Sequence, residues 1–337
     1  MIIGDREIAG KHLERIGYYR LKAYWFPFME PSGSLCDGNG APNGRTETFR
    51  PETEFRYGVE LYIFDKKLRL LLLDAIERIE VALRVAIAHT VGLRGGAFAH
   101  KYVKNLDPNL AIRIVKDDND EPIAEEVLTT AETPITEVMP IAVEEQTEKV
   151  DKTAYGRWAR RARFAETRSK ADWVLDYRRI YGKEQPLPLW MAVELWDFGQ
   201  LSKFLEMART QDRMTIASKF ALPNPAILAS WVKTLAVVRN MCAHHSRVWN
   251  NPLAIQPKIL PSSNIPRMEH VAASHQMRSR IYAATAVAQH FLDTTNPKSQ
   301  WKHRLRSLWA EFPDISGVSA AQAGFIDGWE TQPIWNF

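Results

Sequence analysis

Three residues with the chemistry to cleave RNA lie close together in the stretch 224–251, NPAILASWVKTLAVVRNMCAHHSRVWNN. A neutral imidazole such as that of His244 can take the proton from a ribose 2′-hydroxyl. A guanidinium such as that of Arg239 can stabilise the charge that grows on the phosphoryl oxygens. Asn240 can orient either the histidine or the phosphate. Arg239, Asn240 and His244 are therefore candidate catalytic residues for RNA cleavage that uses no metal ion.

The stretch that carries these residues is expected to be a buried helix. Asn224 can cap its start and Pro225 suits its first position, where no backbone N–H is needed. Asn240 and His244 are four residues apart and share a face, whereas Arg239 and His244 point about 140° from each other. A second copy of the chain could supply the missing group. The apolar residues that recur at three- and four-residue steps form the buried stripe: Ile227, Leu228, Trp231, Leu235 and Val238.

The spacing alone does not single out Arg239, because similar Arg to His spacings occur elsewhere in the chain. The favourable context is the polar Asn240 and the crowding of His245, Ser246 and Arg247, which makes His245 and Arg247 supporting candidates. The alternative is a helix end at which His and Arg complement the helix dipole and Asn satisfies backbone groups. Both interpretations stay open at this stage.

Composition indicates a globular protein without a resident metal or cofactor. The chain has 337 residues, 45% of them hydrophobic, so it can bury a large core. Cys36 and Cys242 are far apart and lack metal-ligand spacing, which fits a reducing cytoplasm, and Cys242 is expected to be a small core residue. No apolar run approaches the roughly 20 residues that span a bilayer, and the N-terminus is charged, so we expect neither secretion nor membrane insertion.

The distribution of charge favours a polyanionic partner. The net charge is +4, but residues 105–151 contain 13 acidic and 3 basic residues, which leaves the rest of the chain with 41 basic and 27 acidic residues. Such a basic body suggests nucleic acid ahead of a membrane. A solvated basic surface without a partner is the alternative.

Two basic stretches are candidates for RNA contact, because cationic side chains there alternate with aromatic rings. In the first, His12–Phe28, most rings are expected to pack into the core, which leaves Arg20 and Lys22 as contacts. In the second, Tyr155–Arg179, the candidate phosphate contacts are Arg157, Arg160, Arg161, Arg163, Arg168 and Lys170.

Helical periodicity predicts an all-α body. The longest helix should cover 52–91, end at the glycines of 92–96 and carry an ion pair, Glu80 with Arg84, that could orient a catalytic Arg or His. Further helices are expected at 187–208, broken or kinked at Gly199, and at 268–293. The stretch 31–51 should be a loop, and the acidic insertion a β-hairpin or disordered.

Six stretches in order resemble the bacterial abortive-infection proteins of the AbiD/AbiF type, the Abi-like family, which carry a HEPN fold. They are IGYYRLKAYWFPF, YIFDKKLRLLLLDAIERIEVALRVAIAH, RSKADWVLDYRRIYG, LPLWMAVELWDFGQLSKF, SWVKTLAVVRNMCAHHSRVWN and AGFIDGWETQPIW. The resemblance implies a HEPN helical bundle with Arg239, Asn240 and His244 as its R-x4-H motif. It also implies a toxin-type, metal-independent endoribonuclease that works as a homodimer and is held by a structured non-coding RNA. Relatives tend to have another helix before IGYYRL, and the role of the acidic insertion does not carry over.

From these patterns we expect four consecutive segments. They are N-terminal helices including the first HEPN helices (1–104), the acidic insertion (105–151), the HEPN core with the R-x4-H motif (152–295), and a C-terminal tail that packs on the bundle (296–337). The function expected is a cytoplasmic anti-phage ribonuclease with RNA as its partner. The alternatives are a non-catalytic RNA-binding or scaffold protein and a helical interaction protein that binds no RNA.

Overall fold

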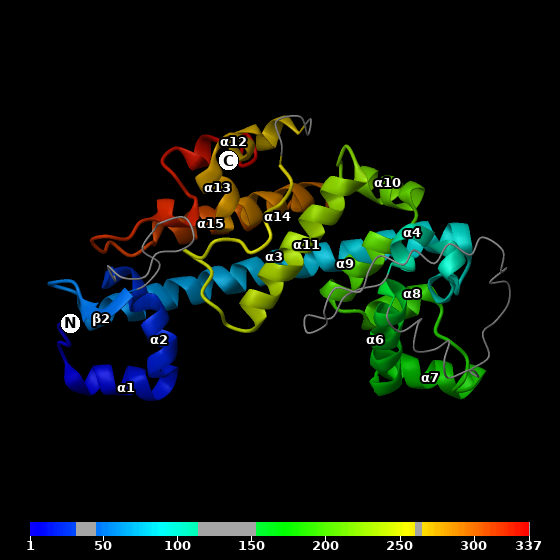
Figure 1. Ribbon diagram of the computed structural model, residues 1–337, viewed down its shortest axis with the longest axis horizontal. Coiled ribbons are helices and arrows are strands. Elements are labelled where there is room, and N and C mark those ends of the chain that lie inside the picture. Colours follow the sequence, from blue (N-terminus) through cyan, green and yellow to red (C-terminus); the bar gives the residue numbers. More distant parts are fainter. Residues whose placement is uncertain (32–44, 114–152, 260–264, 337) are drawn as a thin grey trace. The chain divides into compact units, whose positions relative to one another are not determined.

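The structure, a computed structural model, describes residues 1–31, 45–113, 153–259 and 265–336. Its regular structure is overwhelmingly helical, so the expected all-α class is confirmed (Figure 1). Strands within the described ranges are confined to one antiparallel pair, β1 (Met29–Pro31) and β2 (Arg45–Phe49). The expectation of a plain loop at 31–51 was therefore wrong at β2, where Phe49 pairs with Met29.

The described residues form two compact units, Met1–Ile79 with Lys233–Phe337 (unit 1) and Glu80–Val232 (unit 2). Two helices, α3 (Phe55–Gly95) and α11 (Pro225–Ala243), run through the boundary between the units. The four consecutive segments expected from the sequence stay a prediction. Residues 114–152, which contain most of the acidic insertion, lie outside the described residues. The hairpin or disorder predicted for the insertion falls in the same range.

Unit 1 contains the N-terminal and C-terminal helices. Its other elements are α1 (Arg6–Ile16), α2 (Tyr18–Trp25), η1 (Phe26–Phe28), η6 (Pro266–Met268), α12 (Glu269–Ala273), α13 (His275–Ser279), α14 (Ile281–Thr295), α15 (Trp301–Ala310), η7 (Ala320–Ala323) and η8 (Trp329–Thr331). In unit 2 the elements are η2 (Ala99–Lys101), η3 (Val103–Asn105), α4 (Pro108–Ala111), α6 (Ala154–Arg168), α7 (Asp172–Tyr181), α8 (Leu189–Ala192), η4 (Val193–Leu195), α9 (Phe198–Met207) and α10 (Thr210–Lys219).

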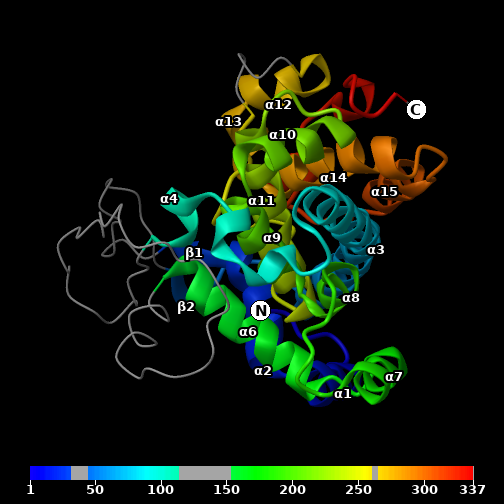
Figure 2. The ribbon, with the colours of Figure 1, turned by 90° about the vertical axis from the view of Figure 1, so that its right-hand side faces the viewer.

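The long helix α3 forms as its apolar periodicity predicts. Its residues at three- and four-residue steps are fully buried, among them Leu61, Leu68 and Leu72. In unit 1, α15 lies beside α3 (Figure 2), where the Trp301 indole Nε1 donates to the Leu71 carbonyl oxygen at 2.7 Å. The helix ends at Gly95, within the expected glycine-rich stretch.

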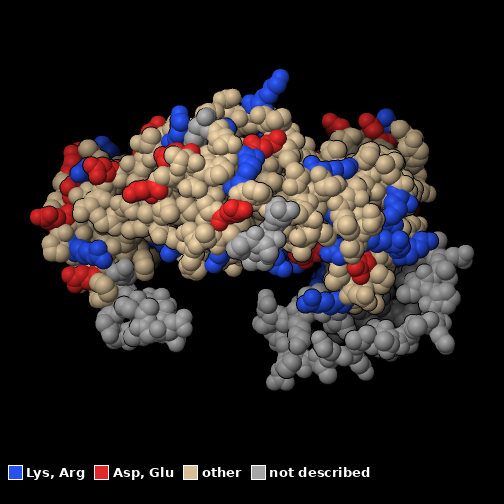
Figure 3. Space-filling model, turned by 90° about the horizontal axis from the view of Figure 1, so that it is seen from above, with Lys and Arg blue, Asp and Glu red and all other residues tan. Residues whose placement is uncertain are grey.

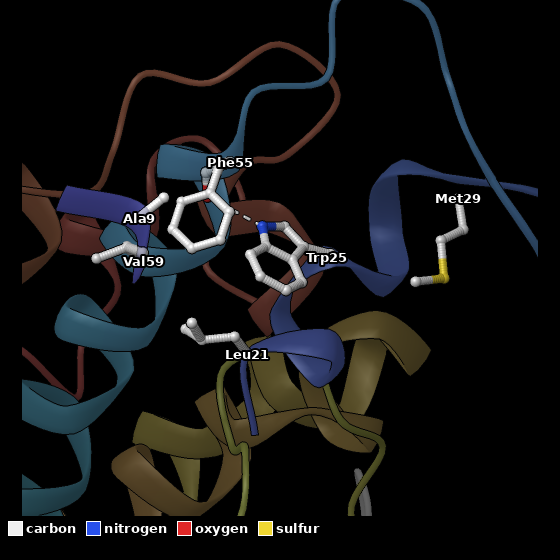
Figure 4. Close-up of a cluster of buried hydrophobic side chains, with 6 residues drawn as sticks. All are labelled: Ala9, Leu21, Trp25, Met29, Phe55 and Val59. Carbon is white, nitrogen blue, oxygen red and sulfur yellow. Dashed lines mark hydrogen bonds between the residues drawn. The ribbon is translucent and has the colours of Figure 1, made fainter. Parts of the chain in front are cut away.

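Gly58 allows α2 to pack closely against α3. A Cβ at this position would lie 2.3 Å from Nε1 of Trp25, so any side chain would displace the indole. Trp25 instead packs among Leu21, Phe55 and Val59 (Figure 4), and its Nε1 donates to the Phe55 carbonyl oxygen at 3.0 Å. Gly58 is therefore a packing position of the long helix.

The expectation that most rings of His12–Phe28 are buried was wrong. Tyr24 and Trp25 lie in the core, whereas Tyr18, Tyr19 and Phe26 are 49%, 84% and 41% exposed. The reason is a break at Gly17, whose φ of 89° ends α1 and starts α2 as a separate short helix. Only one face of such a short helix can reach α3.

One buried carboxylate, that of Asp65 on α3, connects three parts of unit 1. It accepts hydrogen bonds from the Tyr24 hydroxyl at 2.6 Å, from the Arg69 guanidinium, and from the backbone N–H groups of Val248 and Trp249. Burial raises the pKa of the Asp65 carboxyl against the opposing hydrogen bonds and the charge of Arg69. The network fixes the chain immediately after α11.

Unit 2 has its own aromatic core. The rings of Trp158 (α6), Trp196 and Phe204 (α9) lie with centroids 4.8–5.0 Å apart. The expected break at Gly199 was wrong, because Asp197 starts α9 with a capping box and Gly199 lies inside that helix. Gln200 provides the partner groups of the box, with its backbone N 2.8 Å from Asp197 Oδ1.

The expected continuous helix at 268–293 was also wrong, since η6, α12, α13 and α14 replace it. Ser274 caps α13 by accepting from the Met277 backbone N–H, and Arg280 is extended at φ −118° and ψ 175°. The guanidinium of Arg280 donates to the Asn250 carbonyl oxygen at 2.6 Å. A tertiary contact thus accompanies this break.

Of the described helices, α11 alone is long and apolar enough to cross a membrane, although the sequence pattern had been read as containing no such run. Half of that stretch is buried inside the protein, and core helices of soluble proteins pass the same test. Trp231, Val232 and Leu235 are among its fully buried residues, so we assign α11 to the core.

We expect Asp65→Ala to lower the free energy of unfolding by about 3–5 kcal/mol, because it leaves the buried Arg69 charge and two backbone N–H groups without their acceptor. The control Glu60→Ala on the same helix removes an exposed ion pair with Arg56. It should change the free energy of unfolding by less than about 1 kcal/mol. Urea unfolding of both variants checks this. Equal losses would contradict a special role for Asp65.

His100 predicts an acid sensitivity of unit 2. The side chain is 1% exposed, packs edge-on against Trp196, and has no hydrogen-bond partner for either ring nitrogen among the described residues. Burial lowers its pKa from 6.5 to about 3, so between these values the unfolded chain takes up a proton that the folded chain does not. Stability is therefore lost as the pH falls through this window.

His100 should lower the free energy of unfolding by about 2 kcal/mol between about pH 7 and about pH 5. We expect His100→Leu to remove this part of the pH dependence. The exposed His275 provides the control, because His275→Leu should leave that difference unchanged. Thermal or urea unfolding at the two pH values measures it. The same acid loss in the parent and in His100→Leu would refute the assignment.

Candidate functional site

The helix that carries the candidate catalytic residues is anchored as the sequence predicts. It begins at Pro225, and the Asn224 side-chain oxygen accepts from the backbone N–H of Ile227 at 3.0 Å. The predicted stripe is buried, with Ile227 4% exposed and Leu228, Trp231, Leu235 and Val238 fully enclosed. The apolar stripe of α11 is therefore part of the core.

That end closes with a two-bond helix cap built on a histidine. His245 has φ 59°, a left-handed conformation that glycine adopts more readily. Its backbone N–H donates to Cys242 at 3.1 Å, and the N–H of Ser246 reaches back to the Met241 carbonyl oxygen at 2.8 Å. The helix therefore stops abruptly at Ala243, directly beside His244.

The predicted catalytic side chains are accessible. Arg239 is half-buried, and Asn240 and His244 are exposed. A guanidinium N–H of Arg239 (Nη1) donates to Oδ1 of Asn240 at 3.2 Å. In the described part of the chain no hydrogen bond joins Arg239 to His244, as expected from their divergent directions. Within one copy, the guanidinium of Arg239 is therefore hydrogen-bonded to Asn240 and not to His244.

Arg247, a supporting candidate, holds the polypeptide that follows the helix. Its guanidinium donates to the Ala23 carbonyl oxygen and, at 3.0 Å, to Oδ1 of Asn251, and it lies 5.9 Å from the ring centre of Phe26. Burial lowers the pKa of Arg247. These contacts give Arg247 a structural role on α2.

His245 contributes both backbone and side chain to the site. Its carbonyl oxygen accepts a long bond, 3.4 Å, from the guanidinium of Arg20, one of the predicted RNA contacts. Its side chain is exposed next to His244. Lys22, the other contact predicted on α2, is half-buried.

The Glu80–Arg84 pair forms as predicted, with Nη2 of Arg84 2.5 Å from Oε1 of Glu80. The same nitrogen donates to the Trp196 carbonyl oxygen at 2.9 Å, which ties α3 to the turn before α9. These partners belong to unit 2, whereas Arg239 and His244 belong to unit 1. The proposed orienting role of the pair stays a prediction.

The basic stretch predicted to track phosphates lies mainly on α6. Its exposed cations are Arg160, Arg161, Arg163, Arg168 and, just after the helix, Lys170, while Arg157 is half-buried. Arg168 lies 5.0 Å from the ring centre of the exposed Phe164, which pairs a cation with an aromatic face. A hollow of about 460 Å³ between Arg160, Arg161 and Phe164 also contains the Asp197 carboxylate.

On the face seen in Figure 3, Lys and Arg side chains stand among Asp and Glu side chains, and several of them gather toward the right-hand end of the view. In a complex with a nucleic acid, such cations would position the phosphate backbone without reading its sequence.

The sequence pattern did not identify Asp65, Tyr24 and Arg69 as determinants of the site. The available signal was the four-residue spacing of Asp65 and Arg69, which usually marks a surface ion pair. Cys242, expected in the core, is 1% exposed, and burial raises the pKa of its thiol to about 12. A thiol that stays protonated is a poor nucleophile, which agrees with a packing role.

Metal-ligating side chains do not gather in the described ranges, where no three His, Cys, Asp or Glu residues are grouped to hold an ion. The side chains at the end of α11 offer a guanidinium, an amide and imidazoles.

Comparison with known proteins places the chain in a family. The sequence model of the family described as Abi-like protein matches residues 11–250, which include the end of α1 and the whole of α3, α6 and α11. No curated protein and no solved structure matches the chain. The matched region covers well over half of the sequence and contains Arg239, Asn240 and His244. The chain therefore belongs to the Abi-like protein family.

Proposed function

We propose that this protein is a HEPN-type endoribonuclease of abortive infection, which cuts RNA in the cytoplasm without a metal ion and is held in check by a structured non-coding RNA. Membership of the Abi-like family supports a role in anti-phage defence. The observation that carries the ribonuclease proposal is the exposure of His244 beside the half-buried Arg239, at the abruptly closed end of a buried helix.

The proposed reaction is an internal transesterification. His244 takes the proton of a ribose 2′-hydroxyl as the 2′-oxygen bonds to phosphorus and the bond to the 5′-oxygen breaks. The leaving 5′-oxygen takes a proton from water, which leaves a 2′,3′-cyclic phosphate and a 5′-hydroxyl, and the imidazolium of His244 returns its proton to the resulting hydroxide. Arg239 stabilises the charge on the phosphoryl oxygens, and Asn240, which accepts from Arg239, holds that guanidinium or the phosphate in place.

We propose that two copies of the chain form the site. Within one copy Arg239 bonds to Asn240, and the closed helix end restricts the backbone that carries His244. A homodimer with twofold symmetry would bring Arg239 of one copy opposite His244 of the other. A composite site of this kind also needs dimer assembly before it can cut, which offers a step for regulation.

A second candidate function is supported by the same helix end. The capping bonds at His245 and the Arg239–Asn240 contact give these residues a structural explanation. A non-catalytic RNA-binding or scaffold protein would then bind RNA without cutting it. Salt-sensitive RNA binding that survives substitution of Arg239 and His244 would favour this candidate.

We expect Arg239→Ala and His244→Ala each to lower RNA cleavage by about 10²–10⁴-fold and to relieve growth inhibition. Both side chains lie outside the core, so circular dichroism should show an unchanged fold. Cleavage of end-labelled RNA in the presence of a chelator measures the effect. Arg6→Ala and His275→Ala, which remove exposed residues of the same types from unit 1, are the matched controls. A parental cleavage rate in either site variant would contradict the assignment of Arg239 and His244 as catalytic residues.

Mixing the two inactive variants tests the composite site. In a hybrid dimer, the Arg239→Ala copy supplies His244 and the His244→Ala copy supplies Arg239, so one of two sites is complete. Hybrids purified through two different affinity tags should recover about half of the parental activity per dimer. If hybrids stay as inactive as each variant alone, each copy builds its own site.

A further inference from the structure

A hollow in unit 1, separate from the catalytic side chains, has the chemistry of a nucleotide site. It has a volume of about 470 Å³, within the ~300–1,000 Å³ range of ligand pockets. Helices α1, α2 and α3 line it together with the end of α11. We call it the cationic hollow, defined by Arg15, Arg20, Tyr62, Lys66 and Arg69 with the apolar residues around them.

The hollow carries positive charge that the described residues do not neutralise. Arg69 is buried and paired with Asp65, so its charge is compensated. Arg15 and Lys66 are exposed without a described carboxylate partner, and Arg20 bonds only to the backbone of His245. Among the residues that the structure describes, no acidic side chain lines this hollow, whereas Asp197 lines the hollow on α6. Three uncompensated cations around one hollow favour a phosphate group.

The rest of the lining suits a nucleobase. Tyr62, Leu70 and Leu73 form an apolar wall from α3. The ring of Tyr62 is held in place by the edge of Tyr24, with ring centres 5.5 Å apart, and by Arg69, 5.9 Å from its centre. A rigid aromatic and aliphatic wall next to cations is the combination that single-stranded nucleic acids use for base and backbone contacts.

The hollow adjoins the proposed catalytic residues. Cys242 and Ala243 line it from α11, and they lie three and four residues after Arg239, so all three share one face of that helix. His245, which also lines the hollow, directly follows His244. An RNA strand at Arg239 would thus have its neighbouring nucleotide at the hollow.

We propose that the cationic hollow binds the nucleotide next to the scissile phosphate of a single-stranded RNA. The phosphate of that nucleotide contacts Arg15, Arg20 and Lys66, and its base lies against Tyr62 and Leu70. This inference rests on the proposed ribonuclease function, because it names a subsite for the same substrate.

The test uses the full chain and a short single-stranded RNA methylated at every 2′-oxygen, which cannot be cut because the attacking hydroxyl is blocked. Binding is measured by fluorescence anisotropy over a range of salt concentrations. Lys66→Ala and Arg15→Ala should each weaken binding. Each should also reduce the slope of log binding constant against log salt concentration by about 0.7, the value for one lost phosphate contact on a single strand. Tyr62→Leu should weaken binding about tenfold with the salt slope unchanged.

Lys298→Ala is the matched control, since it removes an exposed lysine of the same unit that lies outside the hollow. The hollow proposal is overturned if Lys66→Ala and Arg15→Ala bind like Lys298→Ala, or if the parent protein does not bind the methylated RNA. Crosslinking of 4-thiouridine placed next to the cleaved bond gives the position of that nucleotide on the protein. The expected crosslink is to the α3 peptide that contains Tyr62.

The two proposals fail in different ways. A parent that binds methylated RNA through Lys66 but leaves unmodified RNA intact overturns the ribonuclease, and with it the place of the hollow beside a scissile phosphate. A parent that cuts RNA while Lys66→Ala and Arg15→Ala bind like the control overturns the hollow alone.

Discussion

The buried carboxylate of Asp65 is the interaction on which the arrangement of unit 1 depends. It joins α2, α3 and the chain after α11 through one side chain that is fully enclosed. A buried ion pair such as Asp65 with Arg69 adds little net stability over an apolar pair, because both charges must be desolvated. Its consequence is specificity, since another path of residues 246–249 would leave buried donors without an acceptor. The position of His244 follows from that constraint.

The strained residue of the helix cap lies where the chemistry is proposed. A non-glycine residue in the left-handed region is uncommon, although histidine enters it more readily than most residues do. His245 keeps this conformation because the capping bonds and the neighbouring Asp65 network fix the chain on both sides. Ala221 ends α10 with the same pair of backbone bonds, so a left-handed residue of this kind marks an abrupt helix end and is not by itself a sign of function.

Local patterns predicted what local physics controls. The periodicity of α3 and the capped start of α11 are properties of single helices, and the sequence was sufficient for them. The breaks at Asp197 and Arg280 were missed because each depends on a cap or a tertiary bond that overrides helix propensity. The Asp65 network was missed for a related reason. Its donors lie 41 and 184 residues away in sequence, so no spacing rule could connect them.

The proposed subsite and the proposed site imply a direction for the RNA strand. The cationic hollow is lined by Cys242 and Ala243, which share a face of α11 with Arg239, whereas His244 of the same copy is not among its lining residues. A strand whose nucleotide occupies the hollow would pass Arg239 of that copy before it meets an imidazole. On this reasoning the general base comes from the second copy. Each copy would bind one strand and stabilise its charge, and would supply the base that acts on the other strand. Dimerisation would then be a requirement of the chemistry itself, and a bound RNA that separates or blocks the two copies would silence both sites at once.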